Sequence, residues 1–366
     1  MPGYHQPGTI SGLVFFSKPS MTDRRNFRSD NEAPAHPAIL EALVAANRGL
    51  ASAYAEDEWS RRLDAAFSEL FATECRVLPL ATGTAANSIL LAAMCPPWGA
   101  VLCHKAAHIH NDEGGAPEFY TDGAKLIALD GENGRLDPAH LAEVIDGTGV
   151  HGVHNVKPAA LSLTQATECG TCYRPEQIRA LADVAGQRGL AVHMDGARFA
   201  NAVAFLDCHP ADITWRAGVD ALSFGLTKNG AIAAEAMVVF DPDRWQEALN
   251  RRRKRGGHLL SKMRFVSAQL LAMLENDLWL ELAGHANAQA RALADGIRAS
   301  DRAQLKWPCE ANEVFIQAEP AVLDALAEQG FGFHRWPGYR DVGRLVTSFA
   351  TTLDGVGEFL EALEHA

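Results

Sequence analysis

The amino-acid sequence predicts an α/β protein in which a mostly parallel central sheet is flanked by helices. Short apolar runs alternate with stretches of helical spacing from Val77 to Phe240, which is the pattern of strands joined by crossover helices. After about Arg264 the rhythm changes to long helices and then to a shorter mixed section. We therefore expect a large domain built on this sheet and a small C-terminal α+β domain.

Two amphipathic helices are expected first, at 38–48 and 59–75, because apolar residues recur there at helical spacing. The strands of the large sheet are expected at the apolar runs 77–80, 100–103, 125–129, 159–163, 190–194, 221–224 and 236–240. The helices between them are expected from 83 to 94 and at 137–145, 175–188 and 210–217. The C-terminal part is expected to contain helices at 267–282, 285–299 and 354–365 and strands at 313–318 and 343–349.

These elements suggest a division of the chain into four parts. Residues 1–20 are poor in charge and rich in glycine, proline and serine, and we interpret them as a disordered extension or a cloning remnant. An N-terminal segment at 21–60 leads into a large domain at 61–264. Linking helices and the small domain occupy 265–366, with boundaries that are accurate to a few residues.

Composition and charge favour an enzyme that acts on small molecules. The 366 residues are 48% hydrophobic and carry a formal net charge of −12, which argues against a nucleic-acid binder. No apolar run approaches the roughly 20 residues that span a bilayer, so no membrane partner is expected. Seven scattered cysteines suggest a reducing cytoplasm. Cys169 and Cys172 form a C-x-x-C pair, but no second pair completes a zinc site, and we interpret both as incidental thiols.

A turn of small residues at 82–87, Thr-Gly-Thr-Ala-Ala-Asn, leads from a short strand directly into a helix. The free N–H groups and the positive end of the helix dipole then point to one place, which favours an anion such as phosphate. Taken alone, the same turn is equally compatible with an ordinary strand–helix connection that a threonine caps. The phosphate interpretation gains support from the residues that follow.

Asp195 and Lys228 are placed where a ligand would meet the sheet. Asp195 ends one apolar strand, and Lys228 follows another within Gly-Leu-Thr-Lys-Asn-Gly at 225–230. A lysine amine forms a Schiff base with an aldehyde cofactor, and an aspartate keeps a pyridine nitrogen protonated, which is the pairing used for pyridoxal 5′-phosphate (PLP). The alternatives are a helix-capping aspartate and a lysine exposed in a loop.

Two further clusters have open interpretations. Residues 103–113 contain three histidines and two carboxylates, but their spacing matches no familiar metal-ligand pair, so we expect no metal. An imidazole that stacks on an aromatic cofactor is the better use of one of these histidines. The basic run 251–255 in an acidic chain is either a solvated or nucleic-acid-binding face or a group that reaches a phosphate, perhaps in a neighbouring subunit.

Seven motifs follow one another along the chain from residue 21 to the C-terminus: Phe27-Arg28-Ser29-Asp30, Gly83-Thr84-Ala85-Ala86-Asn87, Ala106-Ala107-His108, Leu163-Thr164-Gln165-Ala166-Thr167-Glu168, His193-Met194-Asp195-Gly196-Ala197-Arg198-Phe199, Thr227-Lys228-Asn229-Gly230 and Ser261-Lys262-Met263-Arg264-Phe265. Their order and spacing resemble the threonine aldolase group of fold-type I PLP enzymes, specifically the low-specificity L-threonine aldolases. The resemblance implies a fold-type I PLP-dependent transferase-like architecture. One departure is Thr227-Lys228-Asn229, where many members have Ser-Lys-Gly.

The resemblance also implies roles for individual residues. Lys228 is the Schiff-base lysine, Asp195 pairs with the pyridinium nitrogen, and His108 stacks on the ring. The phosphate is held by Gly83, Thr84 and Thr227, with Lys254 contributing from the adjacent subunit. The substrate carboxylate is held by Ser29, Arg198 and Arg344, and Arg198 also borders the cofactor. His154 corresponds to a histidine near the substrate hydroxyl, and either His108 or His154 is the base that removes the hydroxyl proton.

The implied activity is an aldehyde-lyase reaction, the PLP-dependent cleavage of L-threonine, L-allo-threonine and related β-hydroxy-α-amino acids, including phenylserine, to glycine and an aldehyde. The same lysine and aspartate also serve β-eliminating lyases, racemases and aminotransferases, which are the alternatives within PLP chemistry. A non-catalytic binding protein with this fold and a nucleic-acid binder that uses 251–255 are rivals from other classes. The expected assembly is a homo-oligomer, a dimer of dimers, whose active site is shared across a dimer interface.

Overall fold

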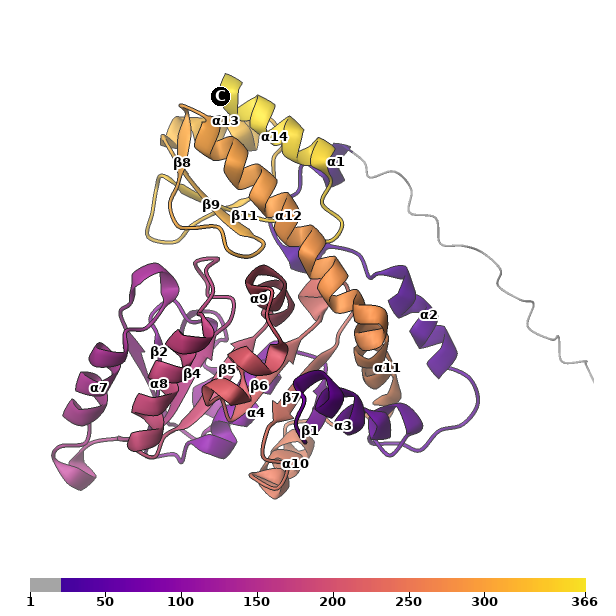
Figure 1. Ribbon diagram of the computed structural model, residues 1–366, viewed down its shortest axis with the longest axis vertical. Helices are drawn as coiled ribbons and strands as arrows, with labels where there is room; N and C mark the ends of the chain where they lie inside the picture. Colours follow the sequence, from indigo (N-terminus) through magenta and orange to yellow (C-terminus); the bar gives the residue numbers. More distant parts are fainter. Residues whose placement is uncertain (1–20) are drawn as a thin grey trace, which may run out of the picture.

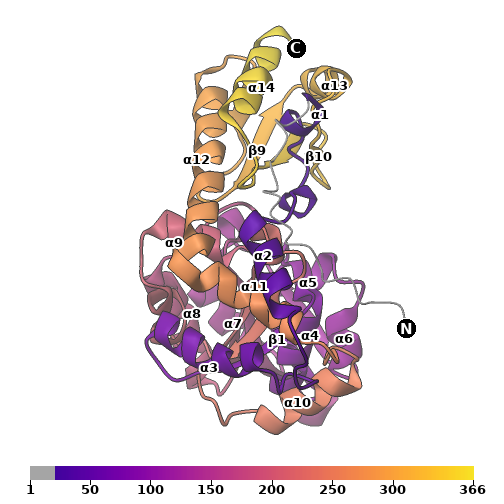
Figure 2. The same cartoon turned by 90° about the vertical axis from the view of Figure 1, so that its right-hand side faces the viewer.

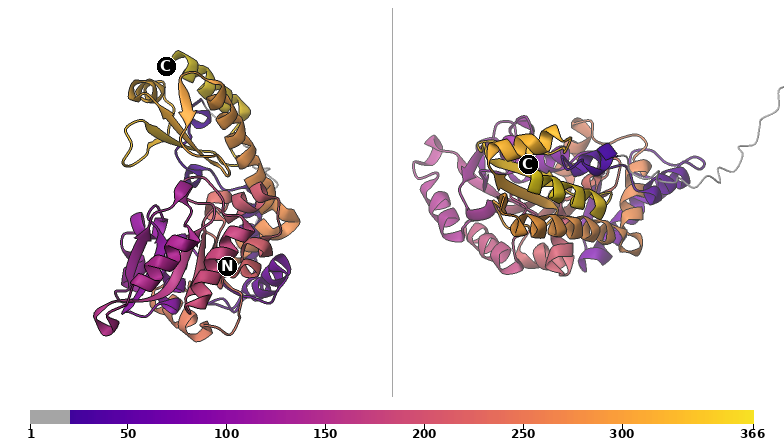
Figure 3. Two further views of the ribbon diagram at one scale, coloured as in Figure 1. Left: turned by 60° about the vertical axis from the view of Figure 1, so that its left-hand side comes forward. Right: turned by 90° about the horizontal axis from the view of Figure 1, so that it is seen from above.

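The computed structural model describes residues 21–366, so the interpretation of residues 1–20 lies outside the described residues. Two lobes follow each other along the long axis of the molecule (Figures 1 and 2). The larger lobe contains a seven-stranded sheet and the smaller lobe a four-stranded sheet. Helix α12 (Leu278–Ala299) runs from one lobe into the other. Seen from above, the small lobe covers the middle of the large one (Figure 3).

The strand order of the large sheet is β1-β7-β6-β5-β4-β2-β3. Strand β7 is antiparallel to both of its neighbours and the other strands are parallel, which confirms the predicted mostly parallel sheet. Strands β2, β5, β6 and β7 are buried along their whole length, which is why they appear in the sequence as unbroken apolar runs. The seven strands are β1 Arg76–Leu80, β2 Gly99–His104, β3 Lys125–Leu129, β4 Lys157–Thr164, β5 Ala191–Gly196, β6 Ala221–Gly225 and β7 Glu235–Val239.

Helices cover both faces of this sheet. Residues of α4, α6 and α10 join the hydrophobic cluster on one face, whereas α2, α3, α7, α8, α9 and α11 contribute to the cluster on the other face. The helices are α1 Met21–Arg24, α2 Pro37–Ala46, α3 Glu58–Phe71, α4 Gly83–Met94, α5 His108–Asn111, α6 Ala116–Tyr120, α7 Pro138–Gly147, α8 Pro175–Gln187, α9 Phe199–Leu206, α10 Gln246–Arg255 and α11 Arg264–Leu274. This three-layer arrangement is the expected α/β architecture.

The structure differs from the expected helices at two places. The segment 210–217 forms two short 3-10 turns, Pro210–Ile213 and Trp215–Ala217, instead of one α-helix. The break between the two long C-terminal helices lies at Glu275–Asp277, because Asn276 and Asp277 adopt left-handed backbone conformations with φ of 54° and 55°. Helix α12 therefore continues through the position at which a break was expected.

The small lobe has an antiparallel sheet in the order β10-β11-β9-β8, with helices packed against it. Strand β9 matches the predicted strand 313–318, and the closing helix agrees within one residue with the predicted helix 354–365. The elements are β8 Ala303–Leu305, β9 Glu313–Ala318, α13 Pro320–Glu328, β10 His334–Arg335, β11 Val342–Val346 and α14 Leu353–His365.

The first part of the N-terminal segment, around Phe27, belongs to this small lobe. Phe27 is fully buried in the cluster of small-lobe residues that includes Ile316 and Phe359. Its N–H donates to the carbonyl oxygen of Gly332 (2.8 Å), and its own carbonyl oxygen accepts from the N–H of Val346 (2.8 Å). The chain then leaves for α2 in the large lobe, so residues from both ends of the described range build the small lobe.

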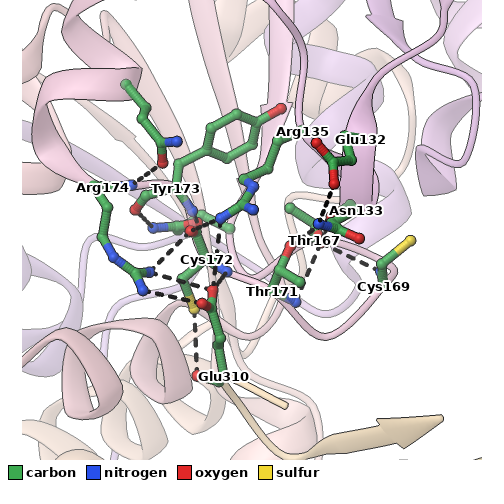
Figure 4. Close-up of polar contacts among 12 residues, drawn as sticks. Glu132, Asn133, Arg135, Thr167, Cys169, Thr171, Cys172, Tyr173, Arg174 and Glu310 are labelled. Atoms are coloured by element: carbon green, nitrogen blue, oxygen red, sulfur yellow. Dashed lines mark hydrogen bonds and ion pairs between the residues drawn. The ribbon is translucent and has the colours of Figure 1, made fainter. Parts of the chain in front are cut away.

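Glu310 holds the two lobes together (Figure 4). Its carboxylate accepts from Nη2 of Arg174 (3.0 Å) and from the N–H of Cys172 (2.8 Å), both of which precede α8 in the large lobe. Cys172 and Cys169 are free and buried, and burial raises the pKa of the Cys169 thiol to about 12. No cluster of metal-ligating side chains occurs in residues 21–366. The C-x-x-C segment thus supports the contact between lobes.

Candidate active site

The candidate site lies at the carboxyl edge of the large sheet, below the small lobe. Asp195 stands near the end of β5, and Lys228 belongs to the 3-10 turn η6 (Thr227–Asn229) that follows β6. Gly83 begins α4 immediately after β1. Because the ends of parallel strands meet at one edge, residues far apart in the sequence are brought together here.

The turn at which we expect an anion lies at the amino end of α4. Thr82 caps the helix, since its Oγ1 accepts from the N–H of Ala85 (3.3 Å). The N–H groups of Gly83 and Thr84 lie in the first turn, where a helix provides no partner for them. Among the described residues, a Cβ at Gly83 would have one neighbour within 4 Å, Oε2 of Glu235 at 3.7 Å, so the backbone here can be approached closely. This is a suitable cradle for a phosphate group.

Asp195 is 4% exposed and is held by two donors. Its Oδ2 accepts from Nδ2 of Asn87 (2.9 Å) and its Oδ1 from the N–H of Ala197 (3.0 Å). Asn87 lies one turn after Gly83 on α4, so one helix provides both the phosphate turn and a clamp for the carboxylate. An oriented, buried carboxylate is what a pyridinium nitrogen requires.

His108 begins the short helix α5 and faces Asp195 and Lys228 closely enough for both to influence its charge. Its Nδ1 lies 2.9 Å from Oε1 of Glu113, which also accepts from Nδ2 of Asn87 (2.8 Å). The hydrogen bond to Glu113 raises the pKa of His108, against the effect of burial. The ring is therefore held in one orientation and can carry a proton near neutral pH.

The loop that carries Lys228 is held on both sides. Nδ2 of Asn229 donates to the carbonyl oxygen of Trp279 (2.8 Å), which fixes the turn to α12. Gly230 has a φ of 102°, and a Cβ there would lie 3.1 Å from Phe349. A side chain at this position would thus be strained as well as crowded. The lysine is presented from a rigid turn, and its position does not depend on loop mobility.

Arg198 and Arg344 lie together with two carboxylates between the lobes. Nε and Nη2 of Arg198 bind Asp30 at 2.8 and 3.0 Å, and Nη1 lies 3.4 Å from Glu313. Nη1 of Arg344 lies 3.7 Å from the other oxygen of Glu313. Ser29 precedes Asp30, and its Oγ accepts from the N–H of Asn31 (3.1 Å). The residues expected to hold a carboxylate are therefore adjacent, and they come from both lobes.

Three carboxyl groups at this site were not identified from the sequence. Asp30 was seen only as part of a motif, and its partner Arg198 is 168 residues away. Glu313 and Glu235 each begin an apolar strand, where a single charged residue gives no periodic signal. Only their burial, at 1% and 6% exposure, marks them as unusual.

Two predicted site residues are not brought to this place. His154 ends an exposed 3-10 turn (Gly152–His154) just before β4, at the amino edge of the sheet and opposite the edge that carries Asp195. Lys254 is exposed on α10, and its Nζ lies 4.3 Å from the ring centre of Tyr54. Its neighbour Arg253 is buried, and two of its guanidinium nitrogens have no hydrogen-bond partner among residues 21–366.

The described residues fit PLP. The turn at Gly83 accommodates a phosphate, Lys228 provides an amine, Asp195 a clamped carboxylate and His108 an oriented imidazole. The chain matches the model of the beta-eliminating lyase family over residues 26–320. It is 42% identical to the low-specificity L-threonine aldolase of Pseudomonas aeruginosa, over 92% of this chain and 97% of the relative. The chain belongs to the threonine aldolase group of this family. This confirms the resemblance, and enzymes of this family and fold depend on PLP.

Further relatives agree with this family. The low-specificity L-threonine aldolase of a Pseudomonas species is 42% identical over 87% of this chain and 91% of the relative. The solved threonine aldolase of Leishmania major superposes with a TM-score of 0.85, at 27% identity, over 93% of this chain and 98% of the other. The tryptophan decarboxylase of Catharanthus roseus has a TM-score of 0.74 at 14% identity, which shows only that the fold is shared.

Proposed function

We propose that this chain is a PLP-dependent aldehyde-lyase that cleaves L-threonine and related β-hydroxy-α-amino acids to glycine and an aldehyde. The observation that carries this proposal is the arginine pair at 198 and 344, next to a lysine–aspartate pair at a phosphate-binding turn. Relatives at 42% identity are named low-specificity L-threonine aldolases, which supports this chemistry over β-elimination or racemisation.

Each part of the cofactor has a residue suited to it. Gly83, Thr84 and Thr227 would hold the phosphate, Asp195 the pyridine nitrogen and Lys228 the aldehyde carbon, while the ring of His108 would stack on the pyridine. When bound, PLP supplies an electron sink for the pair left on Cα. Asn87 supports this arrangement because it holds the carboxylate of Asp195 from the helix that begins at the phosphate turn.

Arg198 and Arg344 would orient the substrate. A guanidinium group binds both oxygens of a carboxylate in one plane, so two of them restrict rotation about the Cα–carboxylate bond. Asp30 occupies Nε and Nη2 of Arg198, which leaves Nη1 directed toward Glu313 and Arg344. Ser29 would add a hydroxyl donor. Fixing the carboxylate in this way selects Cα–Cβ as the bond that breaks.

His108 is the base that we propose for the β-hydroxyl proton. Its Nδ1 is held by Glu113, so Nε2 is the atom left to accept the proton, directly or through water. The raised pKa of His108 suits a group that gains and returns a proton near neutral pH. His154 lies at the opposite edge of the sheet, and we do not retain it as an alternative within one chain.

We further propose that the protein works in the cytoplasm as a homo-oligomer, a dimer of dimers. No helix among residues 21–366 is long and apolar enough to cross a membrane. Lys254 is exposed on α10 and is the cationic group that we assign to the phosphate bound by an adjacent subunit. The division into an N-terminal segment at 21–60, a large PLP-binding domain at 61–264, and linking helices with a small domain at 265–366 remains part of this proposal.

Product analysis tests the activity. Purified protein with PLP should release acetaldehyde and glycine from L-threonine and L-allo-threonine, and benzaldehyde from phenylserine. Lys228→Ala should lose turnover together with the visible absorbance of lysine-bound PLP. The absence of aldehyde from all three substrates would refute the proposal, and a keto acid or ammonia as the main product would indicate one of the other PLP reactions. Analytical ultracentrifugation tests the oligomeric state.

A further inference from the structure

Glu235 is a buried carboxyl group that the proposed mechanism does not use. It is the first residue of β7, and it pairs in register with Leu80 at the end of β1 and with Gly225 at the end of β6. The first of these strands leads to the phosphate turn and the second to Lys228. Glu235 therefore lies between the two segments that would receive the phosphate and the aldehyde of the cofactor.

The chain leaves space for this carboxyl group. Its Oε2 lies 3.7 Å from the position of a Cβ on Gly83 and 2.8 Å from that of a Cβ on Gly225. A side chain at 225 would displace the carboxyl group, and its Cβ would also lie 2.9 Å from Cα of Ala197, so glycine at 225 leaves this space open. The first distance places the carboxyl oxygen directly beside the first residue of α4, where a phosphate would bind.

Thr227 connects Glu235 to this position. The hydroxyl and the backbone N–H of Thr227 both act as donors toward the Glu235 carboxylate. The same hydroxyl oxygen accepts from the N–H of Ala234 (3.2 Å). A hydroxyl group has a single proton and two lone pairs. While Glu235 is ionised, Thr227 uses its proton on the carboxylate and has none to donate to a phosphate.

The groups around Glu235 shift the pKa of its carboxyl group in opposite directions. Burial raises the pKa of its carboxyl group to about 7, Asp195 adds to this rise, and Thr227 and Lys228 lower it. Among the described elements packed against β7, α4 and β6 contain no titratable side chain, and Arg76 of β1 lies at the far end, opposite Val239. A phosphate dianion at Gly83 would add a second negative charge beside the carboxylate.

We propose that Glu235 takes up one proton from solvent when the phosphate group of PLP binds, and that the neutral acid then donates to Thr227. Thr227 accepts from Glu235 and Ala234 with its two lone pairs and gives its own proton to a phosphate oxygen. The hydrogen bonds that link Ala234, Glu235, Thr227 and the phosphate are then all formed. The only covalent change is the new O–H bond on Glu235. This inference rests on the proposed PLP function and assigns to Glu235 the pH dependence of phosphate binding.

The test is equilibrium binding of PLP to the apoenzyme between pH 6 and pH 9, followed by absorbance, with pyridoxal as the ligand that lacks the phosphate. As the pH increases beyond 7.5, the dissociation constant for PLP should increase more steeply for the wild type than for Glu235→Gln. The difference between the two slopes should approach a factor of ten per pH unit, because binding must protonate Glu235. The two proteins should show the same slope with pyridoxal. Dividing the dissociation constants for PLP by those for pyridoxal cancels the pH effects that are common to both ligands.

Glu168→Gln is a matched control. Glu168 is also buried with a pKa raised by burial to about 7, but its Oε1 accepts from the N–H of His108 (2.8 Å) and Oγ1 of Thr164 (2.9 Å), away from the phosphate turn. Its variant should leave the ratio of PLP to pyridoxal binding unchanged. Identical pH slopes for wild type and Glu235→Gln would overturn the proposal.

Calorimetry on the wild-type protein provides an independent reading. At pH 8, in buffers of different ionisation enthalpy, PLP binding should take up about one more proton than pyridoxal binding. Equal proton counts would overturn the proposal even if Glu235→Gln failed to fold. A protein that binds PLP as proposed but releases no aldehyde would refute the aldolase function and leave this inference intact.

Discussion

Arg198 and Asp30 form a buried ion pair with two hydrogen bonds, of 2.8 and 3.0 Å, between residues that are 168 positions apart. The arginine follows β5 in the large lobe, and the aspartate lies on the N-terminal segment as it leaves the small lobe. Burial alone would raise the pKa of Asp30, but the charges of Arg198 and Lys228 hold it below its usual value. Asp30 is thus ionised at neutral pH and fixes the plane of the guanidinium group.

Replacing Asp30 by asparagine should destabilise the protein. The change leaves the buried charge of Arg198 with Glu313 as its remaining ionic partner, and breaking a buried pair costs about 3 kcal/mol. Urea unfolding at pH 7 should show this loss, whereas Asp243→Asn at an exposed position should unfold as the wild type does. An unchanged unfolding midpoint for Asp30→Asn would mean that Glu313 alone suffices.

Glu313 shares the two arginines with the proposed substrate carboxylate, since it lies 3.4 Å from Arg198 and 3.7 Å from Arg344. Glu313→Gln should therefore lower the KM for L-threonine several-fold, because the charges of both arginines become available to the substrate. Arg198→Lys should raise KM, because an ammonium group lacks the planar fork. Steady-state kinetics with L-threonine measure both effects on KM. A raised KM for Glu313→Gln would show instead that Glu313 positions the arginines.

His193 should make the protein sensitive to acid. Its ring lies between Oγ of Ser162 (2.9 Å) and Oγ of Ser223 (3.1 Å), and burial lowers its pKa to about 4. The folded-state pKa lies below the usual value of 6.5, so the stabilisation by neutral His193 is present above pH 6.5 and is lost as the pH falls toward 4. The total loss is about 3 kcal/mol.

Chemical unfolding at pH 7, 5.5 and 4 tests this expectation. The free energy of unfolding of the wild type should fall more steeply than that of His193→Asn, which cannot gain a charge. The variant will be less stable at pH 7, so the comparison concerns the two slopes and not the absolute values. Parallel slopes would show that other groups cause the loss of stability in acid.

The contact of Glu310 with the large lobe should contribute to stability. Glu310→Ala removes the ionic partner of Arg174 and leaves the N–H of Cys172 without its acceptor, a loss of about 1–3 kcal/mol. We expect a lower melting temperature and faster limited proteolysis between the lobes. Glu319→Ala, at an exposed position of the small lobe, is the matched control and should behave as the wild type. Equal proteolysis rates would contradict a role in holding the lobes together.

The sequence predicts the large sheet well because strands that are buried on both faces consist of continuous apolar residues. It predicts the segment 210–217 poorly, because 3-10 turns and α-helices bury residues with similar spacing over so short a segment. At the candidate site, Asp195 and Lys228 could be found because the first lies near the end of an apolar strand and the second follows one. Glu313 and Glu235 could not, because their importance arises from which groups face them across the fold.

The position of Phe27 determines when this protein can finish folding. Its backbone hydrogen-bonds to Gly332 and Val346, so a segment that is synthesised early waits for residues that are synthesised much later. The large sheet can form while synthesis continues, since all of its strands precede residue 240. The small lobe, and with it the ion pair of Arg344 with Glu313, can form only once the residues up to Val346 have been synthesised.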